Sequence, residues 1–178
     1  MKNENVCCFI TGAFMPFLKE DGNNAQKNEF KEKIRQEIKN LIENENVKLF
    51  YSGMEEGADL FASDFVLSLK DKNDIFLNCV IPFEEQAADY DEKTRDLYFS
   101  VPSRCDNEIM FRRKREFSCR KKRDIYMIDK SNIVFFFWDM KDPYTFSLIS
   151  YASNKKKIIL LDPLYSQHNS SVRRIGIH

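Results

Sequence analysis

Short runs of apolar residues alternate along the chain with segments in which apolar residues recur every three or four positions. The runs are almost continuously hydrophobic, which is typical of strands that are covered on both faces of a sheet. The pattern predicts strands at residues 6–11, 47–52, 75–81, 133–138 and 158–161, with a short additional strand at residues 109–111.

The segments between these runs have the spacing of helices. Phe30, Ile34, Ile38 and Leu41 fall on one face of a helix that follows the first strand. Further helices are expected at residues 58–69, 86–98, 117–128 and 146–152. The alternation implies right-handed crossovers and an α/β fold with a doubly wound, mostly parallel sheet in a three-layer, Rossmann-like arrangement. We assign residues 1–164 to one such domain and residues 165–178 to a polar, flexible C-terminal tail.

Ligands of an open parallel sheet bind beyond the carboxyl ends of its strands. The most informative of these ends is the one where the second apolar run breaks into Gly53 and Gly57, followed by a helix with Asp59 in its first turn. Glycines permit a tight turn without side chains, and the start of a helix offers free N–H groups to a phosphate. A plain strand-to-helix turn, with Asp59 stabilising the helix start, is the alternative that the sequence leaves open.

Several carboxylates are expected at this edge of the sheet, where they could hold ribose hydroxyls or act as acid and base. They are Glu55 or Glu56, Asp59, Glu84 and Asp139. Glu84 follows the rigid Pro82 at a strand end and has no evident local role, so it is the strongest candidate for a ligand contact.

Charge is distributed unevenly in a chain whose formal net charge is zero. Residues 112–123 (RRKREFSCRKKR) are strongly basic, and their only acidic residue is Glu116. Three interpretations stay open. The run could be a solvated helix face with Phe117 turned inward and Arg123 outward, a nucleic-acid patch, or the rim of a ligand site where Arg112, Arg115 or Arg123 neutralises a phosphate.

The cysteines and histidines favour no covalent or metal chemistry. Five cysteines form no C-x-x-C pair, and their odd number argues against a disulfide framework, so a reducing cytoplasm is the expected compartment. The two histidines, His168 and His178, lie in the polar tail, away from any cysteine that they could activate. We expect no metal, no cofactor and no membrane span.

Four sequence pieces resemble one family when they are taken in order. They are residues 7–12 (CCFITG), 52–60 (SGMEEGADL), 79–86 (CVIPFEEQ) and 126–132 (YMIDKSN). Together they resemble the YpsA-like branch of the SLOG superfamily, whose Rossmann-like domains are related to the Lonely Guy phosphoribohydrolases and to the DNA-processing protein DprA. The resemblance covers residues 6–163 and implies binding of a nucleotide or a nucleotide-derived ligand.

The chain departs from the family pattern at the expected phosphate groups. Relatives read T-G-H-R-P after the first strand, whereas Gly12 is followed here by Ala-Phe-Met-Pro. Relatives carry Gly-Gly-Thr before the helix that follows residues 133–138, whereas this chain has Pro143, Tyr144 and Thr145. Proline lacks the N–H that a phosphate cradle uses, and the tyrosine side chain fills space that glycine leaves open. The Lonely Guy signature P-G-G-x-G-T-x-x-E is also missing.

We therefore expect the protein to bind an ADP-ribose-type ligand, and to sense or sequester it rather than turn it over. The alternatives are an N-glycoside or phosphoester hydrolase that uses Glu84 and a second carboxylate, and a nucleic-acid-associated module that uses the basic residues 112–123. A role as an accessory protein of a mobile element is an analogy only. A homo-oligomer could form through Tyr144, Phe146 and Tyr151. The predicted ligand site has no assigned catalytic residue and consists of Thr11, Gly12, Gly53, Met54, Glu55, Gly57, Asp59, Pro82, Phe83, Glu84, Asp139 and Thr145.

Overall fold

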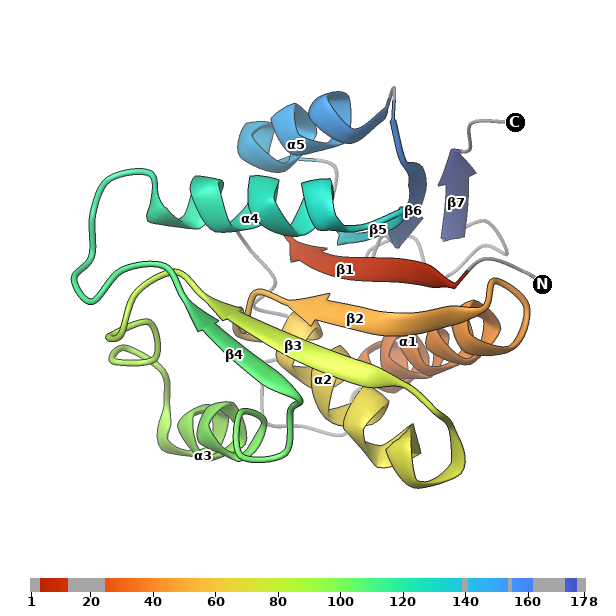
Figure 1. Cartoon of the computed structure of the whole chain (residues 1–178), viewed down its shortest axis with the longest axis horizontal. Helices are drawn as coiled ribbons and strands as arrows, with labels where there is room; N and C mark the ends of the chain where they lie inside the picture. Colours follow the sequence, from red (N-terminus) through yellow and green to blue (C-terminus); the bar gives the residue numbers. More distant parts are fainter. Residues whose placement is uncertain (1–3, 13–24, 139–140, 154, 162–171, 176–178) are drawn as a thin grey trace.

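The computed structural model describes residues 4–12, 25–138, 141–153, 155–161 and 172–175. These residues form a seven-stranded sheet flanked by helices (Figure 1). The strands are β1 (Asn5–Thr11), β2 (Val47–Ser52), β3 (Phe76–Ile81), β4 (Asn107–Met110), β5 (Ile133–Phe137), β6 (Lys157–Leu161) and β7 (Val172–Ile175). The helices are α1 (Ala25–Glu43), α2 (Ala58–Leu69), α3 (Glu92–Ser100), α4 (Cys119–Lys130) and α5 (Pro143–Ser153), and a 3-10 turn (Lys70–Lys72) follows α2.

The strand order is β4-β3-β2-β1-β5-β6-β7, and all neighbours are parallel except β6 and β7. The chain builds one half of the sheet outward from β1 to β4 and then returns to β5 on the other side of β1. The sheet therefore reverses its winding between β1 and β5, which is the usual ligand position in a doubly wound fold. The arrowheads of β1 to β4 point in Figure 1 toward the loop that joins β4 to α4, so this loop lies at the carboxyl edge.

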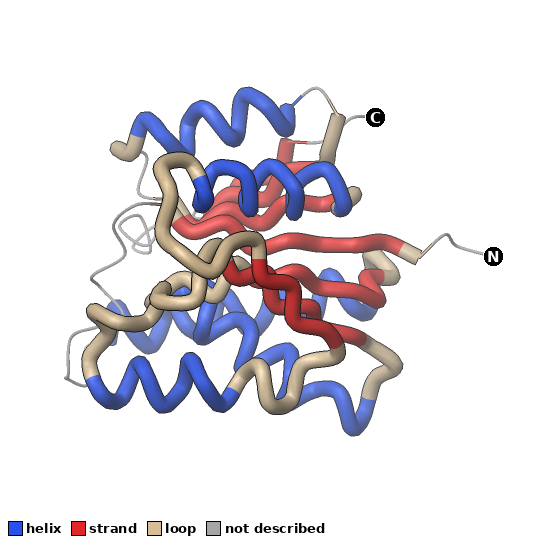
Figure 2. Tube along the Cα trace, turned by 60° about the vertical axis from the view of Figure 1, so that its left-hand side comes forward, coloured by secondary structure: helices blue, strands red, loops and turns tan. Residues whose placement is uncertain are grey.

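Helices cover the two faces of the sheet in separate layers, as Figure 2 shows. On one face, α1 and α2 bury a core that includes Phe30, Phe9, Phe50 and Phe135. On the other face, α4 and α5 pack Met127, Ile128 and Leu148 against the sheet. The three-layer, Rossmann-like α/β fold is thus present. Each buried strand contributes apolar side chains to both layers, which explains its nearly continuous hydrophobic sequence.

Helix α5 begins three residues before the predicted start and other bounds shift by one or two residues, but two elements differ more strongly from the expectation. Helix α3 begins at Glu92 rather than at residue 86, because residues 84–89 form turns and Asp91 caps the helix by accepting a 2.9 Å hydrogen bond from the Thr94 N–H. Strand β7 was not expected, and it lies within the segment interpreted as a flexible tail. Its sequence, VRRI, has no apolar run, and it forms an edge strand that is antiparallel to β6.

Candidate functional site

The polar groups of the turn between β2 and α2 form hydrogen bonds with one another. The Ser52 hydroxyl donates to Asp59 Oδ1 at 2.7 Å and accepts from the Met54 N–H at 3.0 Å. The Glu55 N–H donates to Asp59 Oδ2 at 3.2 Å. Met54 and Gly57 have positive φ angles of 58° and 95°, so the backbone turns sharply here. Two N–H groups that could have met a phosphate are therefore already bound within the turn.

Asp59 is fully buried at the centre of this turn. A third donor, the Ser63 hydroxyl, lies 3.3 Å from its carboxylate. Burial raises the pKa of Asp59 to about 7, although the hydrogen bonds from Ser52 and Glu55 and the charge of Arg123 oppose the shift. Asp59 thus organises the turn from inside, which agrees with the structural alternative left open for it.

Arg123 of α4 lies directly over Gly53. Its Nη1 donates to the Gly53 carbonyl at 2.7 Å, and a Cβ atom added to Gly53 would lie 2.9 Å from the guanidinium carbon. The guanidinium also pairs with Glu55 and Asp124 at 2.7 Å each. Burial by itself would lower the pKa of Arg123, but the charges of Asp124 and Glu55 raise it above its ordinary value. The outward orientation considered for Arg123 is therefore wrong, since its side chain is buried.

Glu55 connects this buried arginine to the surface. Its second oxygen accepts from Arg120 Nη1 at 3.0 Å, and Gln86 Nε2 lies 3.3 Å from its first oxygen. Gln86 also donates to the Gly53 carbonyl at 2.9 Å. Asp124, the other partner of Arg123, accepts a 2.6 Å hydrogen bond from the Tyr144 hydroxyl of α5. One polar network therefore joins the β2–α2 turn to α4 and α5.

The N-terminus of α5 is occupied by a carboxylate of the protein. Asp142 accepts hydrogen bonds from the N–H groups of Tyr144 at 3.1 Å and Thr145 at 2.9 Å, and also from the Thr145 hydroxyl. Pro143 has no N–H to offer. Gly12 packs closely against this helix start, and a Cβ there would lie 3.3 Å from Thr145 Oγ1. Side chains and backbone thus fill the place where the family pattern has its Gly-Gly pair.

A hollow of about 740 Å³ lies beside this network at the carboxyl edge of the sheet. We call it the α4 hollow; it is lined by Phe83, residues 115–121 and Tyr144. The guanidinium groups of Arg115 and Arg120 each lie 5.8 Å from the centre of the Phe83 ring. Phe117 is fully exposed, so the inward orientation considered for it is also wrong. The hollow combines aromatic surfaces with positive charge.

The structure brings the predicted residues together in three groups. Gly53, Met54, Glu55, Gly57 and Asp59 form the β2–α2 turn; Thr11, Gly12 and Thr145 lie at the ends of β1 and α5; and Pro82, Phe83 and Glu84 follow β3. Phe83 lines the α4 hollow, whereas Glu84 is exposed and does not line it. Asp139 lies outside the described residues.

The sequence did not indicate Arg120 or Tyr144 as site residues, and it offered Arg123 only as one of three arginines that could neutralise a phosphate at the rim of a ligand site. The basic run was the signal for the two arginines, but periodicity could not separate the buried one from the exposed ones. Two buried polar atoms near the winding reversal, Thr11 Oγ1 and Trp138 Nε1, have no hydrogen-bond partner among the described residues.

The described part of the chain has no features of a metal site or of a membrane span. No three side chains of the His, Cys, Asp and Glu types gather there as metal ligands would. No helix in that part has the length and apolarity needed to cross a membrane. Burial raises the pKa of the Cys8 thiol to about 12, so this thiol is almost entirely protonated at neutral pH.

The fold and this edge define a doubly wound α/β domain with a ligand-sized hollow at the carboxyl ends of its strands. Residues 17–159 match the model of the YspA SLOG family, also called YpsA, so the chain belongs to this family. The match confirms the resemblance found in the sequence, and family membership suggests a nucleotide-related ligand-binding role. A search of curated protein sequences gives no match.

Proposed function

We propose that the protein binds a nucleotide-derived ligand of the ADP-ribose type at the carboxyl edge of its sheet, and senses or sequesters it without turnover. The observation that carries this proposal is the α4 hollow. Its volume of about 740 Å³ is in the range of small-molecule sites, which are roughly 300–1,000 Å³. Phe117 and Tyr144 offer surfaces for a base or a sugar, and Arg115 and Arg120 offer charge for phosphate.

Binding without turnover is supported by the state of the nearby carboxylates. A hydrolase of nucleotides needs an acid and a base that can reach the scissile bond. Asp59 is sealed in the β2–α2 turn, and Glu55 is ion-paired with Arg120 and Arg123. Glu116 does line the hollow, but it pairs with Arg112 at 3.4 Å and stands without a second carboxylate among the lining residues. These contacts favour holding a ligand over cleaving it.

Mass spectrometry of small molecules released from the purified protein tests the proposal. The protein is purified without denaturation, unfolded in solvent, and its released compounds are compared with those of two variants. We expect a nucleotide-derived mass from the wild type, less of it from Phe117→Ala, and an unchanged amount from Phe76→Ala, an exposed phenylalanine that does not line the hollow. Absence of any such compound, with no capture of added ADP-ribose, would overturn the proposal.

A further inference from the structure

Two positions that the fold offers to a phosphate already contain carboxylates of the protein. In the β2–α2 turn, Asp59 accepts from the Glu55 N–H and the Ser52 hydroxyl. At the start of α5, Asp142 accepts from two N–H groups of the first turn. A phosphate at either position would have to displace a carboxylate and then repel it, since like charges at close range are unfavourable. Neither position is therefore suited to an anion.

Arg123 closes the first of these positions further. Its guanidinium occupies the space over Gly53 that a ligand would need, and it is held there by Gly53, Glu55 and Asp124. A buried arginine with two carboxylate partners is costly to move, because the buried Asp124 would lose its only described cation and Glu55 would keep only Arg120. The glycine turn thus serves an internal contact with α4.

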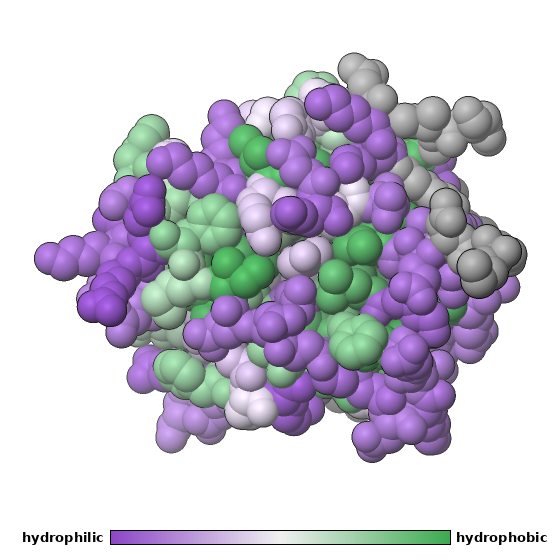
Figure 3. All heavy atoms as spheres, viewed as in Figure 1, coloured by the Kyte–Doolittle hydropathy of each residue, from purple (hydrophilic) through white to green (hydrophobic). Residues whose placement is uncertain are grey.

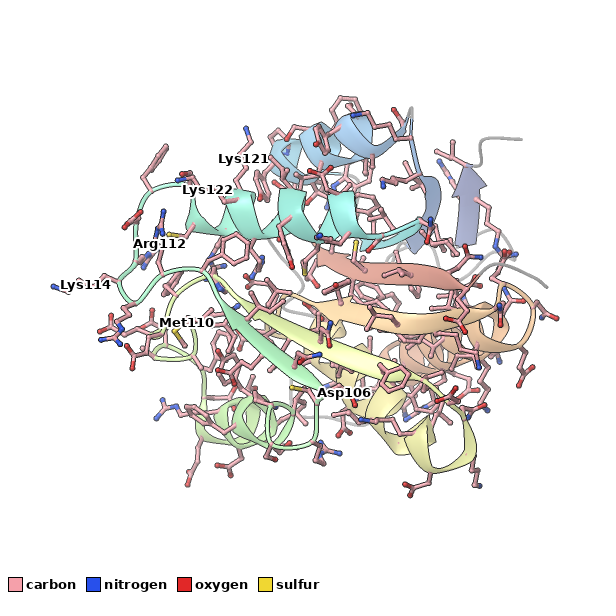
Figure 4. The ribbon with its side chains drawn as sticks, viewed as in Figure 1. Asp106, Met110, Arg112, Lys114, Lys121 and Lys122 are labelled. Atoms are coloured by element: carbon pink, nitrogen blue, oxygen red, sulfur yellow. The ribbon has the colours of Figure 1, made fainter. Side chains whose placement is uncertain are left out.

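The start of α4 has the opposite character. Its first turn contains no acidic residue, and the Ser118 side chain makes no capping hydrogen bond. Arg120 and Lys121 lie in that turn, where the helix dipole disfavours positive charge. Figure 4 shows Lys121 and Lys122 on α4, and Arg112 and Lys114 on the loop that precedes it. Positive charges are thus concentrated at a helix end that they destabilise unless an anion is present.

Two of these basic residues, Arg115 and Arg120, line the α4 hollow. Arg115 comes from the loop and Arg120 from the helix, yet both guanidinium groups converge on the ring of Phe83. Arg115 forms no ion pair with any described residue, and Arg120 has Glu55 as its partner. The space-filling view in Figure 3 shows hydrophilic surface next to apolar patches at the end of the molecule that carries this loop. One ligand could therefore contact both arginines while its apolar part covers an aromatic ring.

We infer that the phosphate groups of the ligand bind in the α4 hollow against Arg115 and Arg120, and not at the β2–α2 turn or the start of α5. Two converging arginines match a ligand with two linked phosphates, that is, a nucleoside diphosphate or a diphosphate-linked derivative. This inference rests on the proposed function, and it adds the position of the phosphates and the two side chains that contact them.

Calorimetric titration with ADP-ribose, AMP and adenosine tests both parts. The test variant is Arg115→Gln with Arg120→Gln, and the single variant Arg115→Gln covers any loss of fold in the double one. The matched control is Arg113→Gln with Lys122→Gln, which removes the same charge from exposed residues of the same run that do not line the hollow. Circular dichroism verifies that each variant is folded.

We expect ADP-ribose to bind the double variant about tenfold or more weaker than the wild type, which is the range for a lost charged hydrogen bond, while the control stays within about twofold. AMP should bind the wild type more weakly than ADP-ribose does. Equal ADP-ribose affinity in the variants and the wild type would overturn the position of the phosphates and leave the proposed function standing. Equal affinity of AMP and ADP-ribose would overturn the diphosphate assignment, and no binding to the wild type would overturn the proposed function itself.

Discussion

Arg123 is a single residue whose buried charge shapes the candidate site. It is 3% exposed and makes ion pairs with Glu55 and Asp124. The desolvation of such a group is offset only if all its partners remain in place. Arg123 therefore fixes the distance between α4 and the β2–α2 turn, and it requires a glycine at position 53.

Gly53→Ala should destabilise the protein by about 2–4 kcal/mol, because the new Cβ meets a guanidinium that cannot move without breaking buried ion pairs. Urea unfolding measures this loss. Arg123→Met should cost about 3–5 kcal/mol by itself, since it leaves the buried carboxylate of Asp124 without a cation and Glu55 with Arg120 alone. In the Arg123→Met background, Gly53→Ala should cost much less, and a fully additive double-mutant cycle would contradict the contact.

Asp59 should make stability depend on pH. Its pKa in the folded protein is raised from 3.8 to about 7, so the folded state binds this proton more tightly than the unfolded chain does. This difference stabilises the folded state. The stabilisation is fully present below the unfolded pKa of 3.8 and is lost as the pH rises through about 7. The limiting slope is about 1.4 kcal/mol per pH unit.

Urea unfolding between pH 4.5 and 8 of the wild type and Asp59→Asn measures this effect. The wild type should lose stability relative to the variant as the pH rises. Parallel stability curves for the two proteins would show that Asp59 ionises with an ordinary pKa.

At the residue scale, the sequence identified Gly53, Gly57 and Asp59 as a special turn, because glycine spacing and an acidic residue at a helix start are local signals. It could not identify Arg123 as the group that fills the turn. The contact spans 70 positions in the sequence, and nothing in the sequence distinguishes the buried arginine from the other seven basic residues of the run. The position of Glu84 as a ligand contact stays a prediction, although its side chain is exposed and outside the α4 hollow.

At the element scale, the two helix starts at the carboxyl edge are built in contrasting ways. Helix α5 begins with Asp142 accepting from its first turn, whereas α4 begins with basic residues and no side-chain cap. A capped start is stable without a ligand, and a basic, uncapped start gains from an anion. In the proposed site, α5 therefore has a structural role, and the start of α4 contacts the ligand.

Asp142→Ala should lower the stability of the protein by about 0.5–2 kcal/mol, the usual range for losing an N-terminal cap. Asp142→Asn is the matched control, because asparagine caps a helix about as well without the charge. Thermal unfolding distinguishes the two variants. If both variants were as stable as the wild type, the capping role of Asp142 would be refuted.

Helices and strands were predictable from the sequence where complete burial makes the segment continuously apolar. Strand β5 (IVFFF) is buried along its whole length and read clearly as a strand. Strand β7 was missed, since VRRI has an edge position and two exposed arginines. Helix α3 starts late because Asp91, a strong capping residue, lies inside the segment that periodicity assigned to a helix.

At the scale of the whole molecule, the strand order brings distant segments to one edge. Phe83 after β3, the loop before α4 and the start of α5 meet there because β1 lies between β2 and β5. The alternation of strands and helices predicted this edge, since parallel strands share the direction of their carboxyl ends. The course of the loop over residues 111–118 was not predictable, because it follows no periodic pattern.

The basic run should contribute little to nucleic-acid binding. DNA affinity that depends on counterion release falls with log[salt] at about −0.9 per phosphate neutralised, so any binding should be weak and vanish near physiological salt. Arg113→Ser with Lys114→Ser and Lys122→Ser should remove this residual binding and leave ADP-ribose affinity unchanged. Fluorescence anisotropy at several salt concentrations measures it. Tight DNA binding that survives moderate salt and is lost in this triple variant would favour the nucleic-acid module instead.

The most direct measurement of the central claim is a ³¹P NMR titration of ADP-ribose with the wild-type protein. This one spectrum reports both contact with the phosphates and cleavage of the ligand. The account predicts that the diphosphate resonances shift or broaden as protein is added, and that no new phosphorus resonance appears over hours. Unperturbed resonances at millimolar ligand would contradict binding, and growth of a monophosphate resonance would contradict holding without turnover.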